Sequence, residues 1–153
     1  MSYVFGVRDL AEQKTLATRA TCTHDLIAST VGSLFAKVGA KLKEFGLKME
    51  GPPHCVYLAW REDDCDLEAG CPVSGHGPSE GDVVESRLPG GRTLVTRHVG
   101  PYDKLHDAHM ACLAYADENE LTLNGAPWEV YFTDPDFEPD SSKWITEVCY
   151  PVE

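Results

Sequence analysis

The sequence predicts an α+β protein made of two β-α-β-β copies, with pseudo-two-fold antiparallel sheets, helices on one side and a central groove. Three observations predict this fold: a long internal repeat, an apolar stripe of helical period in each half, and short alternating segments around each stripe. The 153 residues are 42% hydrophobic and 25% charged, which is ordinary for a globular domain. We therefore expect one domain, with repeat one over about residues 1–78 and repeat two over about 79–153.

The internal repeat is visible at three places. Thr15–Arg19 reads Thr-Leu-Ala-Thr-Arg, and Thr93–Arg97 reads Thr-Leu-Val-Thr-Arg, 78 positions later. Each half closes on a glutamate followed by a Pro-Val pair, at Glu68 and at Glu147. Two copies are too few for a solenoid, so they are expected to pack as a pseudo-symmetric pair with a ligand groove at the seam. Between these places the offset is 74, as Leu47, Gly51, Pro53, Val56 and Tyr57 match Leu121, Gly125, Pro127, Val130 and Tyr131.

The first half contains a strongly patterned helix. Apolar residues at spacings of three and four predict a helix over 25–45, and Gly46 is placed to end it. The offset then falls by four residues, close to one helical turn, so the second helix is expected to be one turn shorter. We expect Asp103 to be its N-cap.

Strands surround each helix. Residues 14–20 and 92–99 are rich in Thr, Leu and Val and alternate in polarity, which is typical of strands. Residues 55–60 and 128–133 follow Gly/Pro turns and are predicted as the next strands. The final strand of each half should end near Pro72 or Pro151, and the Leu88–Gly91 run is expected to form a hairpin or loop.

Charge and hydropathy restrict the possible partners. The formal net charge of −12 argues against direct binding to nucleic acid and suits a cationic partner better, although most of these carboxylates are expected to be solvated surface. No apolar run approaches the ~18 residues of a membrane span, and no basic-then-apolar signal begins the chain. We expect a cytoplasmic protein with no membrane partner.

Cysteine and histidine spacing does not indicate a metal site. The six cysteines contain no Cys-x-x-Cys pair and are expected to be reduced thiols. His106 and His109 lie three apart on the second helix, a spacing at which they could share a metal, and are interpreted as exposed. The acidic segments 62–66 and 133–140 lack the spacing of a calcium loop and are interpreted as turns. No metal and no cofactor is expected.

Glu147 is the main candidate for chemistry. It lies in a segment otherwise suited to a buried strand, where an ionised side chain needs a partner. Alternation places Val148 and Tyr150 on the opposite face, so Glu147 would point to the groove if those two pack under the helices. The alternative is that Glu147 meets water on an exposed sheet face. Glu68 stands beside Ala69 and Gly70 and is interpreted as a surface residue.

Aromatic residues complete the candidate site. Tyr131 and its repeat counterpart Tyr57 are expected near the same groove, where rings beside a carboxylate would suit a flat cationic molecule. Core packing is the alternative for each ring taken singly. The other candidate ligand-binding residues are Tyr102, Trp60, Trp144 and His98.

Three segments carry a family resemblance. His98–Tyr102, Trp128–Pro135 and Thr146–Val152 resemble, in order and spacing, the GyrI-like small-molecule-binding domain, which is also the effector-binding half of multidrug-sensing bacterial regulators. The resemblance implies a groove for lipophilic, often cationic, molecules, with the family's pocket glutamate at Glu147 and its tyrosine at Tyr131. No helix-turn-helix fits before Tyr3, so DNA reading by this chain is not expected.

Three functions follow from the resemblance. We expect a stand-alone module that binds lipophilic, cationic or aromatic molecules for sensing, sequestration or detoxification. The first alternative is a hydrolase that opens strained cyclopropane-type electrophiles, with Glu147 activating water and Tyr131 positioning the substrate or donating a proton. The second alternative is an inhibitor that binds DNA gyrase.

Overall fold

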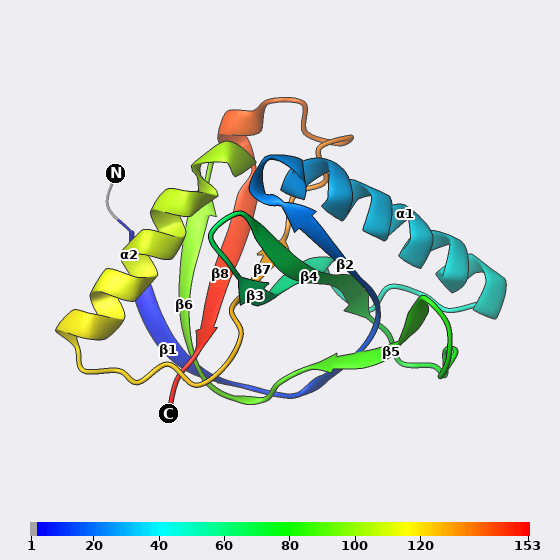
Figure 1. Cartoon of the computed structure of the whole chain (residues 1–153), viewed down its shortest axis with the longest axis horizontal. Coiled ribbons are helices and arrows are strands. Elements are labelled where there is room, and N and C mark those ends of the chain that lie inside the picture. The colour runs from blue at the N-terminus through cyan, green and yellow to red at the C-terminus, as the bar shows by residue number, and fades with distance from the viewer. Residues whose placement is uncertain (1–2) are drawn as a thin grey trace. The chain divides into compact units, whose positions relative to one another are not determined.

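The computed structural model describes residues 3–153, which form two helices and eight antiparallel strands. The chain divides into two compact units, and each pairs a four-stranded antiparallel sheet with one helix (Figure 1). Unit 1 joins the N-terminal segment up to Leu10 to Gly91–Glu153, and unit 2 is Ala11–Gly90. The α+β class and the β-α-β-β frame expected from the sequence are confirmed.

Unit 1 has the strand order β1-β6-β8-β7. Helix α2 packs on one face of this sheet, against β6 and β8. The core beneath α2 contains Leu94, Val148 and Tyr150 from the strands and Ala108 and Cys112 from the helix. The elements are β1 (Phe5–Leu10), β6 (Gly91–Val99), α2 (Leu105–Glu118), β7 (Trp128–Tyr131) and β8 (Ile145–Pro151), with short 3-10 turns at Tyr102–Lys104 and Ser141–Lys143.

Unit 2 repeats this arrangement, with the strand order β3-β4-β2-β5. Helix α1 covers one sheet face, where Val38 packs against Leu16, Cys71 and Val83. Gly46 ends the helix in the left-handed conformation (φ 65°), as the sequence predicts. The elements are β2 (Gln13–Thr23), a 3-10 turn (His24–Leu26), α1 (Ile27–Phe45), β3 (His54–Trp60), β4 (Asp64–Pro72) and β5 (Val83–Leu88).

The strands β1 and β5 were not expected from the sequence. Strand β1 precedes β2 in the chain but pairs with β6, and β5 precedes β6 but pairs with β2. Each short strand thus pairs with the long strand of the other repeat. The registers match, because Leu10 lies opposite Gly91 and Leu88 opposite Gln13. The first strand of each sequence repeat is therefore exchanged, and the compact units differ from the repeats in this respect.

The start of α2 differs from expectation. Asp103 lies within the 3-10 turn that precedes the helix, α2 begins at Leu105, and no side chain caps its first turn. The predicted N-cap role of Asp103 is wrong because this 3-10 turn makes Lys104 the N-cap residue, one position further on.

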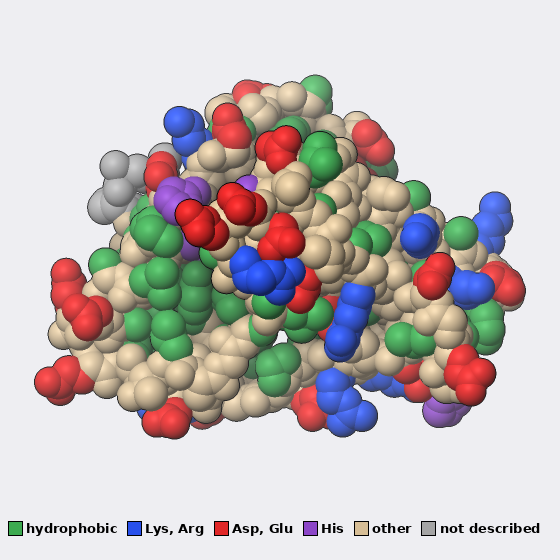
Figure 2. All heavy atoms as spheres, in the orientation of Figure 1, with side chains coloured by type: hydrophobic (Ala, Val, Ile, Leu, Met, Phe, Trp, Pro, Cys, Tyr) green, Lys and Arg blue, Asp and Glu red, His purple; other side chains and the backbone are tan. Residues whose placement is uncertain are grey.

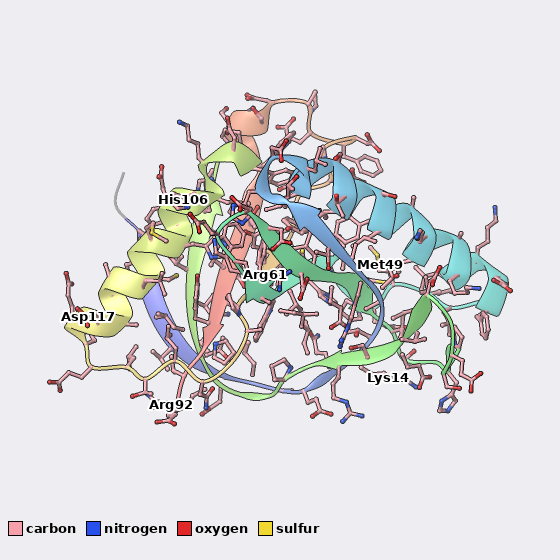
Figure 3. The ribbon with its side chains drawn as sticks, in the orientation of Figure 1. Lys14, Met49, Arg61, Arg92, His106 and Asp117 are labelled. Atoms are coloured by element: carbon pink, nitrogen blue, oxygen red, sulfur yellow. The ribbon has the colours of Figure 1, made fainter. Side chains whose placement is uncertain are left out.

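Charged side chains are interspersed with apolar ones on the face drawn in Figure 2. The acidic segment 133–140 forms bends and turns as expected, whereas in segment 62–66 only Glu62 and Asp63 form a bend and Asp64–Asp66 begin strand β4. Arg61, labelled in Figure 3, binds Asp64 at 2.6 Å and Asp66 at 2.7 Å, and hydrogen bonds from Arg61 and then Thr21 lower the pKa of Asp66 to about 2. In segment 133–140 the Asp140 side chain accepts a hydrogen bond from the Ser142 amide. No helix among residues 3–153 is both long and apolar enough to cross a membrane.

Candidate functional site

Glu147 lies on β8, on the sheet face that α2 does not cover. Its neighbours Val148 and Tyr150 pack into the core under α2, as alternation along the strand predicts. Two guanidinium groups meet its carboxylate: Arg8 Nη2 is 3.3 Å from Oε1, and Arg97 Nη2 is 3.6 Å from Oε2. Glu147 is therefore a largely buried, charge-paired acid, with its side chain 15% exposed.

Tyr131 does not join Glu147. In the ladder between β7 and β8, Val130 lies opposite Glu147 and Tyr131 lies opposite Thr146. Since directly opposed residues share a face and successive residues alternate, Tyr131 lies on the helix-covered face and Glu147 on the other. The sequence-based pairing of Glu147 with Tyr131 is not supported by this register.

A different carboxylate lies beside Tyr131. Glu129, two residues earlier on β7, is only 2% exposed. The Tyr131 hydroxyl donates to its Oε1 at 2.6 Å, and His109 Nε2 lies 2.6 Å from its Oε2. The other ring nitrogen of His109 is 2.8 Å from the Tyr150 hydroxyl, so the network extends to Tyr150. Helix α2 supplies the histidine, and strands β7 and β8 supply the rest.

Aromatic rings adjoin this network. Tyr102, from the turn before α2, meets Tyr131 edge-on at 5.5 Å between ring centroids and Trp144 at 4.7 Å. The three rings are half-buried, whereas Glu129 is buried. Burial, and then the charges of Asp134 and Glu129, raise the pKa of Tyr102. Burial similarly raises the pKa of Tyr150, so both phenols stay neutral donors at neutral pH.

A carboxylate beside aromatic rings is chemically suited to hold a positively charged group. The carboxylate supplies negative charge from within the protein, and the rings present faces that attract a cation placed over them. Tyr131 and His109 hold the carboxylate oxygens in fixed positions, so little ordering is needed when a ligand arrives.

Comparison with known proteins identifies the family. The family model described as GyrI-like small molecule binding domain matches residues 5–153. The chain belongs to this family. A search of curated proteins finds no match. The GyrI-like resemblance expected from the sequence is confirmed.

Solved structures share the fold of this GyrI-like domain. The EcmrR C-terminal domain superposes with a TM-score of 0.90 at 24% identity, covering 100% of this chain and 99% of that one. EcmrR in its complex with DNA gives 0.87 at 24% identity, where the match covers 99% of this chain but 57% of EcmrR. SAV2435 bound to tetraphenylphosphonium gives 0.66 at 14% identity, covering 100% and 94% of the two chains.

His98 has a structural place in this GyrI-like domain. It is fully buried, and its ring nitrogens lie 3.0 Å from the Tyr3 hydroxyl and 3.2 Å from the Pro101 carbonyl oxygen. A ring enclosed and bonded in this way has no surface for a ligand. The expectation that His98 lines a binding site is not supported.

The unit 2 aromatics form their own cluster. Trp60 is 58% exposed and stacks on His24 at 4.1 Å between centroids, while Tyr57 meets Trp60 edge-on at 5.9 Å. Tyr57 pairs with Leu67, so it lies on the face opposite Glu68. The strand register therefore separates Tyr57 from Glu68, the repeat counterpart of Glu147.

Two residues were interpreted wrongly from the sequence. Glu68 is 7% exposed and lies 3.5 Å from Arg19, so it is a buried acid rather than a surface residue. His109 was expected to be exposed but is held between Glu129 and Tyr150, while His106 is exposed as predicted. Glu129 is not among the residues proposed from the sequence, although alternation along the strand places it on one face with Tyr131.

No metal centre is found in the described part of the chain. Residues 3–153 contain no cluster of three or more histidine, cysteine or acidic side chains that could hold an ion. All six cysteines are free thiols.

Proposed function

We propose that this GyrI-like domain binds lipophilic aromatic cations over Glu129, for sensing, sequestration or detoxification. The observation that carries this proposal is the buried Glu129 carboxylate, held by Tyr131 and His109 next to the half-buried rings of Tyr102 and Trp144. Small-molecule binding is the property of the family, and the class of ligand and its position are our proposal.

The chemistry of the cluster supports a delocalised cation. Both oxygens of Glu129 already accept hydrogen bonds, so the carboxylate can attract a ligand through its charge without needing further donors. A large cation without N–H groups loses few hydrogen bonds on leaving water, and ring faces compensate that loss. Tetraphenylphosphonium, the ligand of SAV2435, has this chemistry.

Isothermal titration with two isosteric ions tests the charge. Tetraphenylphosphonium should bind the wild type, and tetraphenylborate, which has the same shape and the opposite charge, should bind at least about tenfold more weakly. Glu129→Gln should weaken tetraphenylphosphonium by about tenfold or more and leave tetraphenylborate unchanged or improved. Tyr102→Ala should weaken both ions, because the ring contributes area as well as polarisation.

Glu147→Gln is the matched control. It removes one buried carboxylate from the other face of the same sheet and should leave both affinities within about twofold, with folding of every variant checked by circular dichroism. If Glu147→Gln abolishes binding while Glu129→Gln does not, the sequence-based assignment of Glu147 is right and ours is wrong. If neither variant changes the affinity, binding does not use a buried acid.

The remaining expectations from the sequence stay predictions. These are the groove between the two repeats, hydrolysis of strained electrophiles, inhibition of gyrase, the lack of binding to nucleic acid and the cytoplasmic location. Hydrolysis by Glu147 with Tyr131 has no geometric support, since the two side chains leave β8 and β7 on opposite faces.

A further inference from the structure

Each unit carries one acid at the same place in its sheet. Glu147 on β8 lies directly opposite Arg97 on β6, and Glu68 on β4 lies directly opposite Arg19 on β2. The arginine lies at the same oxygen in both units, 3.6 Å from Oε2 of Glu147 and 3.5 Å from Oε2 of Glu68. The two carboxylates are therefore equivalent in register, partner and geometry.

The second oxygen is treated differently in the two units. In unit 1, Oε1 of Glu147 is paired with Arg8 from β1. Arg8 lies opposite Thr93 in unit 1. In unit 2 the counterpart of Thr93 is Thr15, and Ser86 lies opposite it, so Ser86 takes the position of Arg8. Ser86 is short and uncharged, and within residues 3–153 no ion pair or hydrogen bond of a side chain reaches Oε1 of Glu68.

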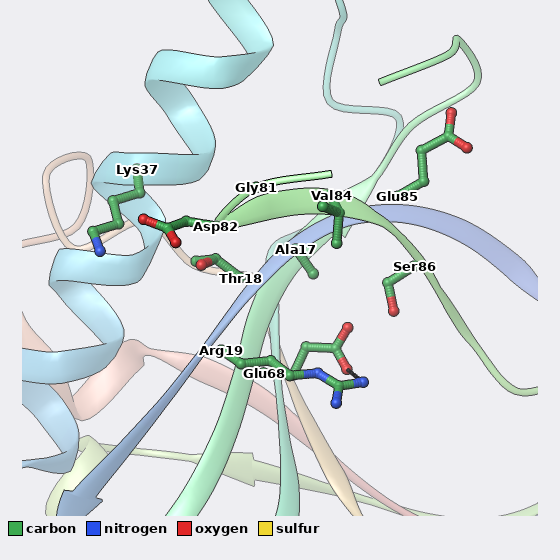
Figure 4. A pocket seen from close by; sticks show the side chains of 10 residues that line it. All are labelled: Ala17, Thr18, Arg19, Lys37, Glu68, Gly81, Asp82, Val84, Glu85 and Ser86. Atoms are coloured by element: carbon green, nitrogen blue, oxygen red, sulfur yellow. Dashed lines mark ion pairs between the residues drawn. The ribbon is translucent and has the colours of Figure 1, made fainter. Parts of the chain in front are cut away.

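A hollow lies where the missing arginine would be. It has a volume of about 410 Å³, opens to solvent, and is lined by Glu68, Arg19, Ser86 and Ala17 (Figure 4). Ala17 is the counterpart of the larger Val95, which widens the space further. The charged lining is acidic on balance, with three carboxylates against two cationic side chains.

We propose that this hollow binds the guanidinium or primary ammonium group of a small molecule at Oε1 of Glu68. The bound group would take the place that the Arg8 side chain occupies against Glu147. A guanidinium suits the site because its planar N–H donors match carboxylate oxygens, and such charge-assisted bonds are the strong ones. Asp82 adds negative charge to the lining and favours a cation over a neutral analogue, whereas Glu85 is already paired with Lys14 at 3.1 Å.

This site is independent of the proposed site over Glu129. It lies in unit 2 at the β2–β5 edge of the sheet, where Lys37 of α1 also lines the hollow, and it requires N–H donors that tetraphenylphosphonium lacks. The two sites therefore select different cations, and each can fail without the other.

Chemical-shift titration of labelled protein with n-butylguanidinium tests the proposal. Shifts should concentrate at the amides of Ala17, Glu68 and Ser86 and should saturate, whereas the neutral isostere n-butylurea should cause none there. Glu68→Gln should weaken binding at least about tenfold, in line with loss of a charge-assisted contact. Equal shifts from n-butylurea, or shifts that avoid these amides, would overturn the proposal.

A pair of reciprocal substitutions tests the comparison between the units. Ser86→Arg supplies the missing arginine and should abolish n-butylguanidinium binding, whereas Ser33→Arg adds the same charge on an exposed site of α1 and should leave binding within about twofold. Arg8→Ser should create a second site at Glu147, seen as new saturable shifts at Glu147 and Val95. Unchanged binding in Ser86→Arg together with no new site in Arg8→Ser would refute the assignment.

Discussion

The two units share a frame but carry their polar chemistry on different faces. On the helix-covered face, unit 1 has Glu129 and Tyr150 where the repeat places Cys55 and Cys71 in unit 2. On the other face, each unit has a buried acid, which two arginines cover in unit 1 and one covers in unit 2. Duplication has thus kept strands, helix and register while single side-chain changes made two dissimilar environments.

The largest expected effect comes from moving the unit 1 acid into unit 2. Cys55→Glu places a carboxylate at a fully buried position whose neighbouring strand offers Cys71 instead of a tyrosine. Even with Tyr57, the counterpart of Tyr131, as one donor on the same strand face, burying this charge should lower the free energy of unfolding by at least about 3 kcal/mol, measured by urea denaturation. Cys22→Glu, at a half-buried position, should lose less than about 1 kcal/mol. A loss below 1 kcal/mol at Cys55 would show that unit 2 can satisfy a buried acid as unit 1 does.

The next prediction compares how much the equivalent strands β6 and β2 contribute to the stability of the two units. Leu94 on β6 and Leu16 on β2 are counterparts, and both are fully buried under their helix. Each change to alanine should cost about 2–5 kcal/mol of unfolding free energy by urea denaturation, because each leaves a cavity in a packed core. Leu26→Ala, at a residue 51% exposed, should stay within about 0.5 kcal/mol of the wild type. A difference above about 2 kcal/mol between the two core variants would mean that the cores are not equivalent.

The fold could be predicted because its signals are local. The Thr-Leu-x-Thr-Arg repeat, the apolar stripe over 25–45 and the capping Gly46 each report on neighbouring residues, and neighbours decide helix and strand. Strands β1 and β5 escaped prediction because their polarity pattern is weak, as at Gly6 and Arg8, and because they form only through pairing with distant segments.

The candidate site could be predicted only in part, for a related reason. Alternation shows that Glu129 shares a face with Tyr131, and that Val148 shares one with Tyr150. Which residue of β7 lies opposite Glu147 is set by register between strands, and a shift of one residue exchanges the faces. The sequence therefore predicted the strands and the kind of residues but placed Tyr131 beside Glu147, whereas its hydroxyl donates to Glu129.

A smaller effect concerns acid sensitivity, which should arise from unit 2. His54 is 2% exposed, and burial lowers its pKa from 6.5 to about 4, whereas its counterpart in unit 1 is Trp128. Below pH 6.5 the unfolded chain binds a proton that the native His54 does not bind until about pH 4. Native stability should therefore fall as the pH drops through this window, by up to about 3 kcal/mol, and this contribution should level off below it.

Urea denaturation of wild type and His54→Gln between pH 7 and pH 4 measures this contribution. Other groups titrate in the same range, so the informative quantity is the difference in unfolding free energy between the two proteins. We expect the wild type to lose its advantage over the variant as the pH falls. A difference that does not change with pH would show that His54 titrates normally in the native state.

The smallest effect is a difference in thiol reactivity between the units. Burial raises the pKa of Cys112 and Cys149 in unit 1 to about 12, and in unit 2 it raises that of Cys71 to about 11. At pH 8 a thiol with a pKa of 12 is ionised in about one molecule in ten thousand, and the thiolate is the reacting species. Reaction of the native protein with a chromogenic disulfide should therefore show one fast thiol, the half-buried Cys22, and Cys22→Ser should remove that phase. Six thiols should react in guanidinium chloride. A fast thiol that remains in Cys22→Ser would have to come from a buried position. If that thiol were Cys112 or Cys149, helix α2 would open from its sheet more readily than α1. The Glu129 network on the α2 face predicts the opposite.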